Sequence, residues 1–428
     1  MEILIVTHYF PPMNSIASLR PYSWAKFWTK AGHNVTVLTT KKGRTEIDLN
    51  LPNQGFNVIE VHSKASRNIK KGNEKSASAN TVKNKKNWLR KKISNYCIRT
   101  GALLHDARYP NLFMFWKKPA VETVIKSGNH FDVAIATFAP FASFMIAFEL
   151  KKRKIVDKTV LDFRDLWIDN HLCTGVSLFS SYEKKLEKKM CSLADKITVV
   201  SDSLADVLCI KYDKNKINVI FNGFDTDDIM DLPQDQYFDN EKINIAFTGS
   251  FYADLVNPHS FFKAIKQLKD ECVFGIDRLR VYFAGARVEQ LIDIVYQYGL
   301  ESTILCMGFV PREDALRMQR DADVLLFLES ENAKTDGILT GKLFEYIFSG
   351  TPIWTIGKKW KPSRMIEEYG IGKAFGNDVE SIKKSLQEVL SGNIPPKYNA
   401  MDIPEIQKYT REYQANEMLK VMENVLEK

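Results

Sequence analysis

The segment VLLFLESENAKTDGILTGKLFEYIFSGTPIWTI, residues 324–356, contains the pattern that decides the fold. Two apolar runs, Val324–Leu328 and Ile353–Ile356, predict buried strands of a parallel sheet. The loop between them contains glycine and leads into a short helix, so the segment predicts a strand–helix–strand crossover. Open α/β sheets bind their ligands at the carboxyl ends of such strands.

The start of this helix combines groups that suit a nucleotide. Backbone N–H groups near Gly341 and the charge of Lys342 suit a phosphate. Glu345 lies three residues further along the same helix face, where its carboxylate can accept hydrogen bonds from two ribose hydroxyls. The alternative interpretation is an ordinary crossover helix that carries a surface Lys–Glu pair.

Length and composition indicate a soluble globular protein of two domains. The chain has 428 residues, of which 45% are hydrophobic and 26% are charged. No apolar run approaches the roughly 20 residues that cross a bilayer. Met1–Val6 reads as a strand rather than a signal peptide, and the six cysteines lack metal-ligand spacing. We therefore expect a cytoplasmic protein without a structural metal.

Strand and helix patterns alternate in both halves of the chain, which predicts an α/β protein of two Rossmann-like, doubly wound parallel-sheet domains. We expect an N-terminal domain over residues 1–232, a C-terminal domain over residues 240–404 and a terminal helix within residues 405–428 that crosses back to the N-terminal domain. A ligand is expected in the cleft between the domains. The predicted strands are Ile3–Thr7, Val35–Thr39, Val58–Val61, Asp132–Thr137, Val160–Phe163, Lys196–Val200, Ile217–Phe221, Ile243–Thr248, Leu279–Ala284, Ile304–Met307, Val324–Leu328 and Ile353–Ile356.

A basic insertion interrupts the first half. Residues 64–99 contain twelve Lys or Arg residues and a single acid, Glu74. Apolar residues alternate with these charges from Trp88 onward, which suggests an amphipathic stretch on an anionic membrane surface. The alternative is a solvated loop. Nucleic acid is not an expected partner, because no recognised nucleic-acid-binding module accompanies the charge.

Glycine or apolar turns follow the strands of the second half. Gly249-Ser250 follows the strand Ile243–Thr248, where glycine lets a phosphate approach the backbone. Phe309-Val310 follows another strand and can flank a nucleobase, although a hydrophobic turn is the plainer interpretation.

The first half offers a possible phosphate contact near its first helix. Asn14-Ser15 precede the predicted helix Ser18–Ala31, which carries Arg20 near its start. An arginine in this place can clamp a phosphate through two parallel hydrogen bonds. Alternatively, Arg20 is a charge on the helix surface.

Ionisable residues also gather at a strand end of the first half. Asp162, Arg164 and Asp165 lie within four positions at the end of Val160–Phe163, which indicates either chemistry in the cleft or a structural Arg–Asp pair. His8 also lies at a strand end, but isolated histidines more often pack or face solvent. The sequence contains no Ser-His-Asp order, HExxH helix or Walker loop.

Several of these motifs occur in one known family. In their order and spacing they resemble the retaining GT-B glycosyltransferases of family 4, in the branch that assembles polysaccharide, capsule or lipopolysaccharide. The resemblance covers nearly the whole chain except the basic insertion. The motifs are Gly32–Val37, Asp162–Trp167, Asn222–Asp225, Phe247–Gly249, Gly341–Tyr346 and Ser349–Ile353.

The resemblance implies a nucleotide-sugar site in the second half. Glu345 matches the second acid of the family's Glu-x7-Glu signature, which holds the ribose. Lys342 and nearby amides, including that of Gly341, would contact the diphosphate together with the Gly249-Ser250 turn. Phe309 and Val310 would flank the base.

In the first half, the resemblance implies contacts to the acceptor and to the donor sugar. Asn14 and Ser15 occupy the loop that closes over donor and acceptor. Arg164 and Asp165 fall where many relatives have a histidine that contacts the sugar. The expected catalytic residues are Asp165 as general base, Arg164 and Lys342.

The chain departs from the family pattern at three places. The first acid of the signature would fall at Gly337, and Asp336 or Glu331 can substitute for it. Ser250, with Tyr252 and Asn257 nearby, stands where the family has an arginine and a lysine, and the histidine is replaced at Arg164.

The expected function is a retaining transfer of sugar from a UDP- or GDP-sugar to a lipid-linked saccharide, without a metal or other cofactor. The protein would work in the cytoplasm, peripherally on the inner face of the cell membrane. Two alternatives are a nucleotide-sugar 2-epimerase of the same fold and a catalytically silent protein that binds nucleotide sugar or acts as a scaffold.

Overall fold

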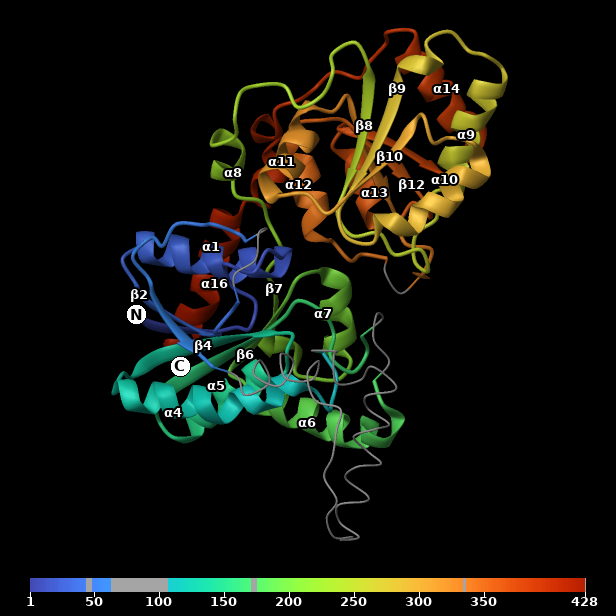
Figure 1. The fold of residues 1–428 in the computed structure, drawn as a ribbon. Helices are drawn as coiled ribbons and strands as arrows, with labels where there is room; N and C mark the ends of the chain where they lie inside the picture. The colour runs from blue at the N-terminus through green and yellow to red at the C-terminus, as the bar shows by residue number, and fades with distance from the viewer. Residues whose placement is uncertain (44–47, 63–106, 171–174, 334–335, 428) are drawn as a thin grey trace, which may run out of the picture. The chain divides into compact units, whose positions relative to one another are not determined.

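The computed structural model describes residues 1–43, 48–62, 107–170, 175–333 and 336–427. Within it the chain forms two compact units (Figure 1). Unit 1 comprises residues 1–220 and 415–428, and unit 2 comprises residues 221–414. The basic insertion, residues 64–99, lies outside the described residues, so its predicted membrane contact stays a prediction.

Unit 1 is built on a seven-stranded sheet in the order β3-β2-β1-β4-β5-β6-β7, and its neighbouring strands pair in parallel. The central strands are buried on both faces, which explains their nearly continuous apolar sequence. The strands are β1 (Glu2–Val6), β2 (Asn34–Thr40), β3 (Asn57–Val61), β4 (Phe131–Phe138), β5 (Val156–Phe163), β6 (Lys196–Val199) and β7 (Ile217–Val219).

Helices cover both faces of this sheet (Figure 1). On one face, Trp24 and Trp28 of α1 share a core with Met418 and Met422 of α16. The indole of Trp28 donates a hydrogen bond to the carbonyl of Ala415 at 2.9 Å, which fixes α16 beside α1. The described helices of this unit are α1 (Ile16–Lys30), α4 (Lys117–Ser127), α5 (Ala142–Lys152), α6 (Ser180–Leu193), α7 (Asp202–Cys209) and α16 (Arg411–Leu426), whose first residues belong to unit 2.

Unit 2 is built on a six-stranded parallel sheet in the order β10-β9-β8-β11-β12-β13. One apolar cluster joins it to α9, α10 and α14, and a second joins its other face to α11, α12 and α13. The strands are β8 (Ile243–Thr248), β9 (Leu279–Ala284), β10 (Ile304–Gly308), β11 (Val324–Leu328), β12 (Ile353–Ile356) and β13 (Gly372–Gly376). The helices are α8 (Asp227–Met230), α9 (His259–Asp270), α10 (Ile292–Tyr298), α11 (Arg312–Asp321), α12 (Gly341–Ser349), α13 (Lys361–Glu368), α14 (Val379–Leu390) and α15 (Pro404–Gln407).

The two sheets confirm the predicted fold class of two Rossmann-like α/β domains. In both, the first three strands are added in one direction and end at an edge strand, β3 or β10. The next strand, β4 or β11, then pairs on the other side of the first strand, β1 or β8, as in doubly wound folds.

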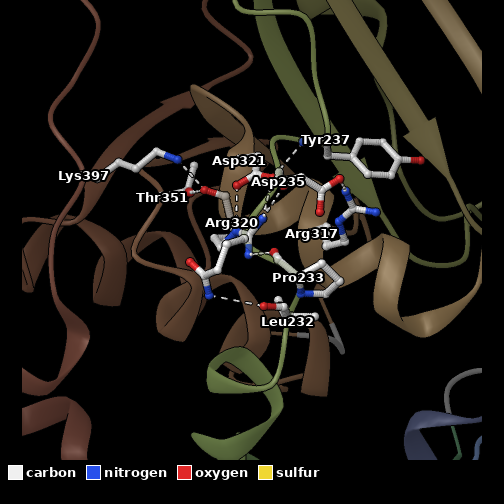
Figure 2. A network of polar contacts seen from close by, with 10 residues as sticks. Leu232, Pro233, Asp235, Tyr237, Arg317, Arg320, Asp321, Thr351 and Lys397 are labelled. Atoms are coloured by element: carbon white, nitrogen blue, oxygen red, sulfur yellow. Dashed lines mark hydrogen bonds and ion pairs between the residues drawn. The ribbon is translucent and has the colours of Figure 1, made fainter.

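The segment after α8 is anchored to α11 (Figure 2). Arg320 donates to the carbonyl of Pro233 at 2.6 Å, and Arg317 pairs with Asp235 at 2.6 Å. The carboxylate of Asp321 accepts the backbone N–H of Tyr237 at 3.0 Å. This segment, which lies between the two domains predicted from the sequence, is therefore held within unit 2 by hydrogen bonds of charged side chains.

Candidate functional site

The N-terminus of α12 presents backbone N–H groups at the carboxyl end of β11, of which that of Leu343 donates to the carbonyl of Thr340 at 3.1 Å. Thr340 precedes the helix in extended backbone and makes no capping hydrogen bond through its side chain. The first turn of α12 contains no acidic residue. Its first N–H groups and the positive end of its dipole therefore suit an anionic ligand.

Lys342 adds a cation to this helix end. Its ammonium lies 3.8 Å from the ring centre of Phe247 in β8 and 5.9 Å from that of Phe327 in β11. Burial lowers the pKa of Lys342 to about 7, although the charge of Glu345 acts in the opposite direction. Among the described residues, the ammonium has neither a hydrogen bond nor an ion pair. A bound anion would supply the missing counter-charge.

Two glycines allow close packing at the ends of β8 and β9, next to the Lys342 side chain. Gly249 has a φ of +124°, a conformation that L side chains rarely adopt, and a Cβ there would lie 2.6 Å from Cε of Lys342. Gly285, with a φ of +134°, packs against the Gly249 carbonyl, where a Cβ would clash. The predicted turn thus approaches Lys342 closely, and Ser250 is exposed beside it.

Glu345 lies one turn further along α12, and its carboxylate already has a cationic partner. It accepts a hydrogen bond from Arg312 at 2.6 Å and a longer one from Gln319 at 3.5 Å. Arg312 also pairs with Asp228 at 2.7 Å. Burial acts to lower the pKa of Arg312, but the two carboxylates outweigh it and raise that pKa. A ribose role for Glu345 therefore requires its carboxylate to accept hydroxyls in addition to this ion pair.

The residues predicted to flank the base lie at the end of β10. Phe309 is 48% exposed, while Val310 is partly buried and packs against the core on the α11 face. An exposed phenyl ring at the carboxyl end of a strand is available for stacking. The base contact stays a prediction.

The two acids considered as substitutes at the start of the signature are engaged elsewhere. Asp336 accepts the backbone N–H of Lys361 at 2.9 Å, at the start of α13, and pairs with Arg364 at 3.3 Å. Glu331 pairs with Lys358 at 3.1 Å. No described contact brings either carboxylate to the N-terminus of α12, and the nucleotide-binding role of Asp336 stays a prediction.

The backbone conformation at position 337 favours glycine over the acid that the family pattern has there. Its φ is +81°, in the left-handed region that disfavours residues with a side chain. The loop before α12 is thus built around a glycine at the position where the family has an acid.

Arg20 corrects the prediction of a phosphate clamp on the first helix. The residue is buried, and it donates to both carboxylate oxygens of Asp162 at 2.8 and 3.2 Å. It also donates to the carbonyl of Ile220 at 2.9 Å. The edge of the Arg20 guanidinium that would bind a phosphate therefore binds Asp162 within the core. The alternative interpretation of Arg20 as a charge on the helix surface is also wrong, because the residue is buried. Ser15 is the N-cap of α1, where its hydroxyl accepts the N–H of Ala17 at 3.2 Å.

Arg164 and Asp165 lie at the end of β5, as the sequence predicts. Arg164 donates to the carbonyls of Phe138 and Ala139, both at 2.8 Å, and its guanidinium lies 5.0 Å from the ring centre of Tyr9. Asp165 is partly buried. The contacts of Arg164 fix the loop after β4, and the catalytic roles of both residues, like the loop role of Asn14, stay predictions.

The part of the chain that the structure describes contains no helix with the length and apolar character of a membrane span. Within the same described ranges, no group of three or more His, Cys, Asp or Glu residues has the geometry of a metal site.

Residues 21–228, just under half of the chain, match the model of Glycosyltransferase Family 4. No curated protein sequence matches the chain.

Solved structures are similar to the chain over its full length. Sucrose-phosphate synthase from Thermosynechococcus elongatus has a TM-score of 0.63 and 13% sequence identity, covering 99% of each chain. The catalytic domain of starch synthase IV from Arabidopsis thaliana, bound to ADP and acarbose, has a TM-score of 0.62 and 9% identity, covering 100% of each. The lipopolysaccharide outer core galactosyltransferase WaaB has a TM-score of 0.52 and 13% identity, covering 99% of each.

At these identities the structural likeness shows the fold alone, a GT-B fold with two Rossmann-like domains. The family match thus covers residues 21–228, and the structural likeness covers the fold of the whole chain.

Proposed function

We propose that the protein transfers a sugar from a nucleoside diphosphate sugar, UDP- or GDP-linked, to a hydroxyl of a lipid-linked saccharide, with retention of anomeric configuration. The observation that carries the proposal is the ammonium of Lys342, which has no ion pair or hydrogen bond among the described residues. It lies at the start of α12, where the N-cap residue makes no side-chain hydrogen bond. A diphosphate matches this site because it can accept from the ammonium and the backbone N–H groups at once.

The chemistry assigned to this site is leaving-group stabilisation. As the bond between the anomeric carbon and the phosphate oxygen breaks, the electron pair goes to the nucleoside diphosphate. Lys342 and the first amides of α12 offset that charge in a preorganised electrostatic site. The acceptor oxygen forms the new bond to the anomeric carbon, and its proton passes to a base, for which Asp165 is the proposed residue.

Unit 1 is proposed to hold the acceptor, with Asn14, Ser15 and Arg164 near it. The proposed place of action is the cytoplasmic face of a membrane, in the assembly of a cell-surface polysaccharide. The basic insertion supports this place, because anionic lipid attracts clustered lysines.

A nucleotide-sugar panel tests the donor assignment. Calorimetry on the full chain should detect binding of UDP or GDP and one of their sugars. Lys342→Met should weaken that binding roughly tenfold to a hundredfold, the range for a lost charge-assisted hydrogen bond. Lys361→Met, a lysine at the start of α13, is the control and should change the affinity little. Equal affinities in wild type and Lys342→Met would contradict the assigned phosphate site.

A catalytically silent nucleotide-sugar binder is the second proposal, and two observations favour it. Gly337 replaces an acid of the signature in a backbone conformation that suits glycine, and Glu345 is paired with Arg312. Incubating the protein with membrane extract and a bound nucleotide sugar distinguishes the two proposals. Release of the nucleoside diphosphate together with a glycosylated lipid supports the transferase, whereas binding without release supports the silent protein.

A further inference from the structure

Three basic side chains gather at the carboxyl edge of the unit 1 sheet, and none of them is among the residues predicted to contact the donor phosphates. His8 follows β1, Lys42 follows β2 and Arg164 follows β5. Because all three strands are parallel members of one sheet, their ends meet at the same edge. His8 and Arg164 each stand out in the sequence at a strand end, whereas Lys42 does not.

Hydrogen bonds join the histidine to the lysine. Nδ1 of His8 lies 2.8 Å from the hydroxyl of Thr40 and 3.4 Å from the ammonium of Lys42. Lys42 donates to the hydroxyl of Thr40 and, at 2.9 Å, to its carbonyl. Since the Thr40 oxygen accepts from Lys42, its own proton is directed to Nδ1 of His8. The histidine is then neutral, with a proton on Nε2 that no described residue accepts.

Aromatic rings bring the arginine into the same cluster. The ring centre of Tyr9 lies 5.0 Å from that of His8 and 5.0 Å from the guanidinium carbon of Arg164. Phe113 packs edge-on against His8 with a centre-to-centre distance of 4.5 Å. These rings place apolar surface beside the basic groups, and a less polar surrounding strengthens electrostatic interactions.

The cluster forms no ion pair with an acidic residue in the part of the chain that the structure describes. Neither Lys42 nor Arg164 forms an ion pair among the described residues. Burial lowers the pKa of Lys42 to about 7, opposed only by the charge of Glu60. Burial, and then the charges of Lys42 and Arg164, lower the pKa of His8 well below its ordinary value. Lys42 and Arg164 are partly buried, and charged groups withdrawn from water are normally paired. Their gathering without an anionic partner among the described residues therefore indicates a bound anion.

The geometry points to a binding site for a phosphate or diphosphate group of the acceptor substrate, formed by Lys42, His8 and Arg164. The inference rests on the proposed transferase function, because the acceptor belongs to that reaction. It narrows the acceptor class to phosphorylated molecules. Two sources share this chemistry: a sugar phosphate and a prenyl diphosphate that carries the growing saccharide.

Binding of three probes by the full chain tests the site: inorganic pyrophosphate, glucose 6-phosphate and farnesyl diphosphate. All titrations use the Lys342→Met background, so that the donor site does not contribute. Adding Lys42→Met should weaken binding of pyrophosphate, and of at least one organic phosphate, by about tenfold or more. Lys41→Met is the matched control, since Lys41 is the exposed neighbour with the same charge, and it should change affinity less than about twofold.

Further variants separate a direct contact from a structural effect. Lys42→Arg keeps the charge and should restore most of the affinity, and His8→Gln should give an intermediate loss while the thermal transition is unchanged. If only the binding of farnesyl diphosphate depends on Lys42, the acceptor is a lipid diphosphate. If only the binding of glucose 6-phosphate depends on Lys42, the acceptor is a sugar phosphate. Equal loss in Lys41→Met and Lys42→Met, or no loss in either, would overturn the site.

The same variants distinguish a failure of the proposed donor site from a failure of the proposed acceptor phosphate site. In the wild-type background, Lys42→Met should leave UDP and GDP binding unchanged. If no nucleotide binds the wild type while farnesyl diphosphate still binds in a Lys42-dependent way, the transferase proposal fails and the phosphate site stands. If nucleotide binds and no probe depends on Lys42, the transferase proposal stands and the acceptor inference fails.

Discussion

The buried charge of Lys342 lowers the free energy of unfolding, and the same residue has a proposed role in binding the nucleotide. Its pKa falls from an ordinary value of 10.5 to about 7 on folding. Between pH 7 and pH 10 the unfolded chain therefore binds more protons than the folded one, and the free energy of unfolding rises with pH. Below pH 7 both states are protonated, and the buried charge has its full cost.

The first prediction concerns this pH dependence. Lys342→Met should raise the free energy of unfolding of the ligand-free protein by about 1 to 3 kcal/mol at pH 6, and by less at pH 9. Chemical denaturation of both proteins across this range measures the difference. A variant less stable than wild type at pH 6 would contradict the assigned burial of an unpaired charge.

Asp162 is a residue whose role follows from contacts that the sequence does not show. It accepts from Arg20, and also from Thr137 and Thr198 at 2.9 Å each. Neutralising it leaves a buried guanidinium without its counter-charge. We expect Asp162→Asn to destabilise unit 1 by about 3 to 5 kcal/mol.

Thermal unfolding of this variant, followed by tryptophan fluorescence, checks the second prediction. Asp169→Asn provides the control because its ion pair with Lys211 is partly exposed, and such pairs contribute about 0 to 1 kcal/mol. Similar melting temperatures for Asp162→Asn and wild type would contradict the assigned role of the buried pair.

At the scale of elements, the backbone at the end of β8 lies close to the Lys342 side chain of α12. Gly249→Ala places a methyl group against the Lys342 side chain at a φ of +124°. We expect the free energy of unfolding to fall by about 1 to 3 kcal/mol. We also expect nucleotide affinity to fall by more than it does in a variant that introduces backbone strain without a clash. Calorimetry with the nucleotide that binds wild type measures the second effect.

Gly299→Ala is the control for this third prediction. Gly299 has a φ of +64° at the end of α10, and no atom lies within 4 Å of the place that an added methyl group would take, so the change introduces strain without a clash. It should leave nucleotide affinity unchanged. Equal effects of the two variants on affinity would contradict the assigned contact between Gly249 and Lys342.

A strand or helix can be predicted from the sequence where its own residues form a clear apolar pattern. Ile243–Thr248, Leu279–Ala284 and Val324–Leu328 are strands with the predicted bounds because they are apolar runs that the sheet buries. β5 begins at Val156, earlier than predicted, since its first residues include the polar Asp157 and Lys158, which interrupt the apolar pattern. The sequence of β13, GKAFG, contains no apolar run, so local pattern does not predict this strand.

The candidate site is predictable only in part, for a related reason. A strand followed by glycine and a helix marks Lys342 and Gly249 from local sequence. The partners of Glu345 and Arg20, namely Arg312 and Asp162, lie 33 and 142 residues away along the chain. Such pairings depend on how the sheet orders its strands, and the positive φ at Gly337 depends on the loop that this order imposes.

At the scale of the whole molecule, charge is distributed so that one segment accounts for the basic character. The chain has a formal net charge of +8, while residues 64–99 contribute twelve positive charges and one negative. The rest of the chain therefore has a net charge of −3. Attraction to an anionic membrane then requires the basic insertion, because the remainder is weakly repelled.

The last prediction concerns deletion of residues 64–99, with a short Gly-Ser linker in their place. The full chain should sediment with vesicles containing anionic phosphatidylglycerol at low salt, and the deletion variant should remain in solution. Binding of the full chain should weaken steeply as ionic strength rises, because the Debye length falls to about 8 Å at 0.15 M. A second variant with the twelve basic residues replaced by Gln separates charge from the apolar residues that follow Trp88. Vesicle binding that survives in both variants would locate the membrane contact elsewhere, whereas binding that survives only in the Gln variant would assign it to the apolar side chains.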